Sequence, residues 1–128
     1  MEHYVDGFVV PVPQTKLADY RRAAERAGKV WMEHGALQYW ESIGDDVQPG
    51  KVTSFPQAVQ LKDGEVVAFS WILYKSREDR DRVNAEVMED PRMKEMMDPK
   101  SMPFDGKRMF WGGFKSVVEL GSSQGASR

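Results

Sequence analysis

Cysteine is absent from this chain of 128 residues, and histidine occurs only twice. The lack of cysteine excludes disulfides, thiol nucleophiles, iron–sulfur clusters and cysteine-ligated zinc. Two histidines are too few for a histidine-rich metal site, so we expect neither a bound metal nor a cofactor. A chain without cysteine also fits a reducing compartment, and we expect a cytoplasmic protein.

The chain also lacks a large excess of charge of either sign and lacks a long apolar run. Its formal net charge is −2 and its pI is about 5.7, so no overall basic field attracts nucleic acid or an anionic membrane. No apolar run approaches the roughly 20 residues that span a bilayer. The start of the chain lacks the pattern of a signal peptide. We therefore expect no nucleic-acid partner, RNA included, and no membrane partner.

The run from Val66 to Tyr74 has the composition of a strand that is apolar on both faces. Because side chains alternate along a strand, Trp71 and its second neighbours face one way, while Ile72 and Tyr74 face the other. Such a strand needs cover on both sides. The chain has enough helix for one face only, so we expect the second face to meet the sheet of a second copy. We take Ile72 as a residue of this outward face.

Periodicity along the chain predicts the element order β-α-β-β-α-β, which is the ferredoxin-like α+β pattern. We expect a four-stranded antiparallel sheet with both helices on one face, and two copies that close a dimeric α/β barrel. Gly28, in the middle of the first helix, is interpreted as a point of close approach to the sheet. The expected strands are 4–12, 36–43, 65–74 and 107–120, and the expected helices are 17–34 and 76–89. We also expect strand character at 57–62, a single domain at 1–120 and a disordered tail at 121–128.

Two acidic residues, Asp6 and Glu41, lie inside predicted strands. Each either lies at a sheet edge, where charge discourages aggregation, or faces a cavity, where its pKa would rise and it would act as a base. We favour the edge for Glu41. The cavity is harder to dismiss for Asp6, because the first strand is central in this fold. Tyr39 and Glu41 should share one face of the second strand.

Two further residues are candidates for acid–base or anion chemistry. His34 ends the apolar stripe of the first helix, where it either complements the helix dipole or acts as a general acid or base. Arg108 lies in a segment rich in proline, charge and aromatic residues, and it either grips an anionic ligand beside Trp111 or pairs with other charges. The candidate catalytic residues are thus His34, Asp6 and Arg108. The candidate ligand-binding residues are Tyr39, Trp71, Tyr74, Asp105 and Trp111, and the ligand is a small apolar or anionic molecule.

Several motifs in order are similar to a known family. They are Tyr4–Pro13, Glu33–Leu37, Gly44–Val47, Met97–Met109 and Gly112–Phe114. Together they resemble the YbaA-like family of uncharacterised bacterial proteins, over roughly residues 4–120. The resemblance implies a dimeric ferredoxin-like α/β barrel and carries no catalytic residues with it.

Two classes of function stay open at this point. Barrels of this architecture host cofactor-independent oxygenases and isomerases that act on flat apolar molecules, which is an analogy at the level of the fold. A supply of aromatic residues near a few ionisable groups favours such a small-molecule enzyme. The alternative is a non-catalytic ligand-binding or stress-related dimer, because the sequence contains no catalytic triad and no nucleotide-binding loop.

Overall fold

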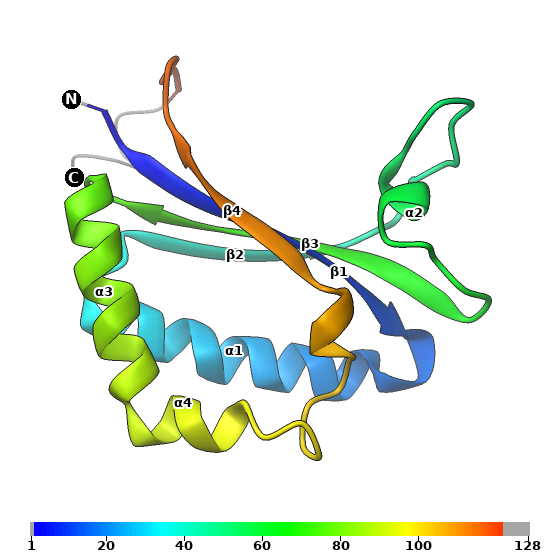
Figure 1. Cartoon of the computed structure of the whole chain (residues 1–128), viewed down its shortest axis with the longest axis horizontal. Helices are drawn as coiled ribbons and strands as arrows, with labels where there is room; N and C mark the ends of the chain where they lie inside the picture. The colour runs from blue at the N-terminus through cyan, green and yellow to red at the C-terminus, as the bar shows by residue number, and fades with distance from the viewer. Residues whose placement is uncertain (1, 122–128) are drawn as a thin grey trace.

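A computed structural model describes residues 2–121. It contains one four-stranded antiparallel sheet in the order β2-β3-β1-β4, with three helices against one face (Figure 1). The strands are β1 (Tyr4–Pro13), β2 (Gln38–Ile43), β3 (Glu65–Tyr74) and β4 (Phe110–Lys115). The helices are α1 (Leu17–His34), α2 (Phe55–Ala58), α3 (Arg77–Glu89) and α4 (Pro91–Met96), with 3₁₀ turns η1 (Gln14–Lys16) and η2 (Gly106–Arg108). The ferredoxin-like prediction is confirmed.

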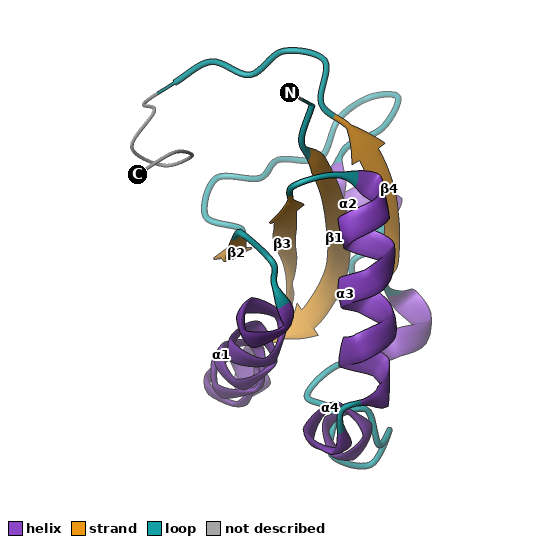
Figure 2. Ribbon diagram, turned by 90° about the vertical axis from the view of Figure 1, so that its left-hand side faces the viewer, coloured by secondary structure: helices purple, strands orange, loops and turns teal. Residues whose placement is uncertain are grey.

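The core lies between the sheet and the helices α1, α3 and α4 (Figure 2). Alternate residues of the central strands β1 and β3 point toward the helices, and Tyr74 is completely buried among them. Val83 and Val87 of α3 pack against the same cluster as Val30 of α1. Burial of these side chains holds both long helices against the sheet, and each large aliphatic side chain contributes about 1.5–3 kcal/mol.

The opposite face of the sheet carries five large aromatic residues, four of them exposed and one, Trp71, half-buried. Trp40 and Trp71 lie directly across the β2–β3 pair and stack with ring centroids 5.5 Å apart. Phe69, Phe110 and Phe114 lie on the same face and are 43%, 46% and 63% exposed. We call this surface, defined by these five aromatic residues, the open face. A large apolar surface of this kind marks an interaction site.

The prediction for Ile72 was wrong. Its side chain is 2% exposed and packs in the core beneath the helices, so it lies on the face opposite Trp71. Both faces of β3 are apolar, and the alternation separated the two sets correctly. Composition alone did not say which set the helices cover.

The predicted boundaries also needed correction at three places. Residues 57–62 form no strand, because the Ser54 hydroxyl accepts a hydrogen bond from the backbone N–H of Gln57 and starts the short helix α2. The last strand is shorter than 107–120, since Asp105 caps η2 before the strand begins and the β1–β4 pairing ends at Lys115. The second strand begins at Gln38 rather than at residue 36. Apart from Gly121, the predicted tail lies outside the described residues.

Candidate functional site

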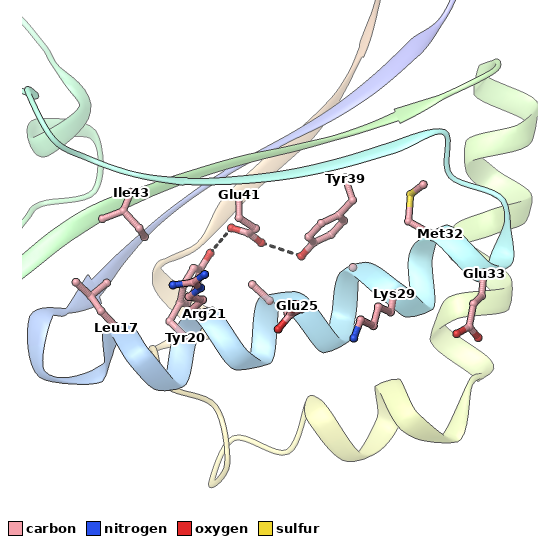
Figure 3. A pocket seen from close by; sticks show the side chains of 12 residues that line it. Leu17, Tyr20, Arg21, Glu25, Lys29, Met32, Glu33, Tyr39, Glu41 and Ile43 are labelled. Carbon is pink, nitrogen blue, oxygen red and sulfur yellow. Dashed lines mark hydrogen bonds between the residues drawn. The ribbon is translucent and has the colours of Figure 1, made fainter. Parts of the chain in front are cut away.

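A cleft of about 870 Å³ opens between α1 and the edge strand β2 (Figure 3). Its size falls in the range of small-molecule sites, about 300–1,000 Å³. The apolar part of its wall includes Leu17, Ala24, Met32 and Ile43. The charged residues Arg21, Glu25, Lys29 and Glu33 also line it, and all four are exposed on α1.

The floor of the cleft depends on a glycine in the middle of α1. A Cβ atom at Gly28 would lie 2.6 Å from a ring carbon of Tyr39 on β2. Only glycine therefore allows this ring to lie so close to the helix. The predicted close approach at Gly28 is confirmed.

Three polar side chains meet inside the cleft. The Tyr20 hydroxyl of α1 donates to Oε1 of Glu41 at 2.7 Å, and the Tyr39 hydroxyl donates to Oε2 at 2.8 Å. Figure 3 shows Glu41 extending from β2 toward α1 between the two tyrosines. Each carboxylate oxygen therefore accepts one hydrogen bond from a tyrosine hydroxyl, and the two bonds fix the orientation of the carboxylate.

Burial alters the acidity of all three groups. Burial raises the pKa of Glu41, although the hydrogen bonds from Tyr20 and Tyr39 oppose this rise. Burial, and then the negative charge of Glu41, raise the pKa of both tyrosine hydroxyls, so both phenols stay neutral donors. A carboxylate with a raised pKa is suited to accept a proton from a bound molecule and to return it.

The predicted site residues include part of this cluster. Tyr39 and Glu41 share one face, as predicted, and Tyr39 lines the cleft. Glu41 does lie on an edge strand, but its side chain turns into the cleft instead of toward open solvent. Tyr20 is not among the predicted site residues, because its polar partner lies 21 residues away in sequence.

Asp6 and Tyr74 belong to a different group of residues, in the core between β1, β3 and α3. The Asp6 carboxylate is completely buried and accepts from Nε of Arg80 at 3.0 Å. The Tyr74 hydroxyl donates to Oδ1 of Asn84 at 3.1 Å. Nε1 of Trp31 donates to the Tyr74 hydroxyl oxygen and to the same Oδ1 of Asn84. Asp6 is thus turned inward, but its partner is Arg80 and it does not line the cleft.

His34 lies at the end of α1, between two carboxylates of other helices. Its Nδ1 lies 3.1 Å from Oε1 of Glu86 on α3, and its Nε2 lies 2.9 Å from Oδ2 of Asp90, which caps α4. Because ionised carboxylates only accept hydrogen bonds, both ring nitrogens must donate, which requires the protonated imidazole. The hydrogen bonds with Asp90 and then Glu86 raise the pKa of His34. His34 therefore joins three helices, and it does not line the cleft.

This contact predicts a pH-dependent stability. Since the pKa of His34 is higher in the folded protein than its ordinary value of about 6.5, its contribution is fully present below that value. The contribution is lost as the pH rises through the raised pKa. We expect the Tm of the wild type to fall more steeply than that of His34→Gln between pH 6 and pH 9, by a few degrees at most, because the pairs are partly exposed. The control is His3→Gln, which should keep the steep pH dependence of the wild-type Tm. If His3→Gln flattens this dependence as much as His34→Gln does, the assignment to His34 is contradicted.

The four remaining predicted residues lie outside the cleft. Arg108 forms an ion pair with Glu65 at 2.6 Å and donates to backbone carbonyls at residues 59 and 60, so it joins η2 to the segment after α2. Asp105 accepts from the backbone N–H of Lys107 as the cap of η2. Trp71 is part of the open face. Trp111 is exposed on β4 and stacks on Phe8 with ring centroids 5.9 Å apart. Their predicted functional roles stay predictions.

Within residues 2–121, no group of three or more histidine, aspartate and glutamate side chains could hold a metal ion. No helix in the same range is long and apolar enough to cross a membrane.

Residues 3–106 match the family described as "Protein of unknown function (DUF1428)". The chain is 52% identical over 116 residues to the uncharacterised protein YbaA of Escherichia coli K12, which covers 91% of this chain and 97% of that protein. The YbaA protein of Shigella flexneri matches with the same identity and coverage. These matches confirm the resemblance to YbaA-like proteins.

Three solved structures share the fold at low sequence identity. A dimeric ferredoxin-like protein from an uncultured marine organism aligns with a TM-score of 0.57 and 11% identity, covering 96% of this chain and 95% of that one. SnoaB, a cofactor-independent oxygenase from Streptomyces nogalater, aligns with a TM-score of 0.54 and 14% identity, covering 94% and 97%. A NIPSNAP family protein of unknown function from Agrobacterium tumefaciens aligns with the same TM-score and identity, covering 90% and 88%. Identities this low show the ferredoxin-like fold alone. The family match over residues 3–106 and the 52% identity to YbaA show the family: the chain belongs to the DUF1428 family.

Proposed function

We propose that the protein is a cytoplasmic homodimer that binds a small apolar molecule in the cleft between α1 and β2, where Glu41 accepts a proton or a hydrogen bond from it. The observation that carries the proposal is the Glu41 carboxylate held between Tyr20 and Tyr39 in a cleft with apolar walls. A half-buried carboxylate inside such a cleft costs stability, which is typical of a group retained for function. The absence of cysteine supports the cytoplasmic location.

The arrangement of protons defines the ligand that the cleft accepts. Both phenol protons already go to Glu41, so the carboxylate offers its remaining lone pairs to a third donor. A ligand with an O–H, an N–H or an acidic C–H group fits this requirement. A ligand carboxylate directed at Glu41 would be repelled, so we favour an apolar molecule over an anionic one.

Removal of a proton by Glu41 is also the chemistry that the site supports best. A single base in an apolar cleft can shift a proton along a substrate without a cofactor, as in an isomerase, and it can equally generate the substrate anion from which a cofactor-independent oxygenation begins. SnoaB, a cofactor-independent oxygenase, shares the fold, and this likeness supports the proposal at the level of the fold. It assigns no role to any residue of this chain.

The alternative is a protein that binds the same kind of ligand without reacting it. The absence of a second buried acid favours this reading, because Glu41 is the only carboxylate among the described lining residues that is not exposed. Conversion of a bound molecule into a product would show an enzyme. Release of the same molecule unchanged would support a binding protein.

Dimerisation through the open face fits the position of the cleft. The open face lies on one side of the sheet and the cleft on the other, so a second copy can cover Trp40 and Trp71 without filling the cleft. The ferredoxin-like neighbour from the marine organism is itself described as dimeric, which supports this arrangement. Two sheets packed face to face would bury the aromatic residues that are exposed in the single chain.

The test of the site is Glu41→Gln, with Glu25→Gln as the matched control. We would screen phenols, enols and other neutral hydrogen-bond donors for compounds that raise the Tm of the wild type, and then measure their affinities. Glu41→Gln should weaken binding by about 10- to 100-fold, the value of a hydrogen bond to a charged group. Glu25→Gln changes an exposed acid on the same cleft and should bind as the wild type does.

The free Glu41→Gln protein should unfold at an equal or higher urea concentration than the wild type, because the buried charge is gone. Binding to the wild type should also weaken as the pH falls through the raised pKa of Glu41, since the acceptor is then protonated. Equal affinity of Glu41→Gln and wild type for every compound that binds would contradict the proposed role of Glu41.

A further inference from the structure

The segment 116–120 exposes its apolar side chains almost completely. Val117, Val118 and Leu120 are 87%, 73% and 92% exposed. Figure 2 shows the chain after β4 rising above the end of that strand and arching over toward the side of β2. We call residues 116–120 the C-terminal arm. Val117 and Val118 are neighbours in the chain, and neither is covered by the rest of the described residues.

Polar contacts nevertheless hold the arm in place at Ser116 and at Glu119. The backbone N–H of Ser116 donates to the carbonyl of His3 at 3.1 Å. The backbone N–H of His3 donates to Glu119 at 2.7 Å, and Nδ1 of His3 lies 2.7 Å from the same carboxylate. The polar residues thus tie the arm to the start of β1, while the apolar residues point outward.

The arm also has the composition of a strand without a strand to pair with. Its sequence Ser-Val-Val-Glu-Leu continues β4, and valine is a strong strand former. The β1–β4 pairing stops at Tyr4 and Lys115, because β1 begins there. Among residues 2–121, no strand therefore pairs with the apolar part of the arm.

The open face is the matching apolar surface, exposed except where Phe55 of α2 contacts Phe69. Phe110 and Phe114 of β4 belong to it, so the arm begins directly beside it. Figures 1 and 2 show the arm on the side of the sheet opposite α1 and α4, so a second copy seated on the open face would meet it.

We propose that the C-terminal arm of each copy packs its valine and leucine side chains against the sheet of the other copy in the homodimer. This inference rests on the homodimer of the proposed function and adds a reciprocal contact to it. Two-fold symmetry places both arms in equivalent positions, so each copy gives one arm and receives one.

The absence of native cysteine allows a direct test by single-thiol labelling. Val118→Cys places one thiol on the arm, and Ala85→Cys places one on the exposed surface of α3, on the helix side of the sheet. The rate of reaction with a disulfide reagent is measured for each variant in native buffer and in urea, and the oligomeric state of the same sample is measured by native mass spectrometry. The protection of a thiol is its reaction rate in urea divided by its reaction rate in native buffer.

We expect a dimer in which the thiol at position 118 is protected at least about tenfold and the thiol at position 85 is not. A dimer with an unprotected thiol at position 118 would overturn the inference and leave the proposed dimer intact. A monomer, whether or not its thiol is protected, would overturn both. As a second measurement, the double variant Val117→Ser/Leu120→Ser should raise the dimer dissociation constant at least about tenfold, since it removes apolar contact area from both arms. An unchanged dissociation constant would also overturn the inference.

Discussion

Trp71→Lys is expected to yield monomeric or insoluble protein. Trp71 lies at the centre of the open face and stacks on Trp40 at 5.5 Å. Dimerisation would remove a lysine at this position from water and leave its charge without an acidic partner. Within residues 2–121, Glu65 is the one charged strand residue of this face, and it already pairs with Arg108. An unpaired buried charge costs several kcal/mol, enough to shift a dimer dissociation constant by about a thousandfold or more.

The matched control for this prediction is Trp111→Lys. Trp111 is another tryptophan of the sheet and is 56% exposed, but it is paired with Phe8 on the helix side. Sedimentation equilibrium should therefore show a dimer for Trp111→Lys and a monomer for Trp71→Lys. A soluble, undisturbed Trp71→Lys dimer would show that the open face is not the interface.

Asp6→Ala is expected to destabilise the folded chain by about 3–5 kcal/mol, the usual cost of removing one partner of a buried ion pair. Asp6 is completely buried, and the Arg80 side chain that donates to it is only 14% exposed. After the substitution Arg80 keeps Asp81 but loses its interior partner, and Asn84 loses an acceptor at 3.4 Å. Such a loss is a large share of the 5–15 kcal/mol that stabilises a typical domain.

Urea unfolding of a double-mutant cycle tests this directly. Arg80→Met in the Asp6→Ala background should recover part of the lost stability, because it removes the unpaired charge and keeps an apolar stem. A loss below about 1 kcal/mol for Asp6→Ala would mean that the pair is unimportant for stability, and would reopen Asp6 as a residue kept for chemistry.

Local patterns predicted the fold, and the reason is visible in β3. Its alternation separated the Trp71 set from the Ile72 set correctly, since the parity of a strand is a property of the sequence. Which set meets the helices depends on packing over the whole sheet, and both sets are apolar. The same limit applies to the stretch at 57–62, where a Ser54 cap followed by a proline started a helix in a segment with strand composition.

The candidate site could be predicted only where its members are close in sequence. Tyr39 and Glu41 are two residues apart on one strand, so their shared face followed from alternation. Tyr20 comes from a helix, and nothing local marks its hydroxyl as the partner of Glu41. Arg108 shows the converse, because a basic residue in an unusual loop looked functional until its contact with Glu65, 43 residues away, was seen.

The most direct measurement of the central claim is a native mass spectrum of the wild type and Glu41→Gln, purified in parallel from cells, each with a denatured control. The proposed function predicts a dimer for both proteins, and a reproducible extra mass on the wild type that disappears on denaturation and is reduced or lost in Glu41→Gln. An extra mass that both proteins retain equally, or its absence from both, would contradict a ligand site at Glu41.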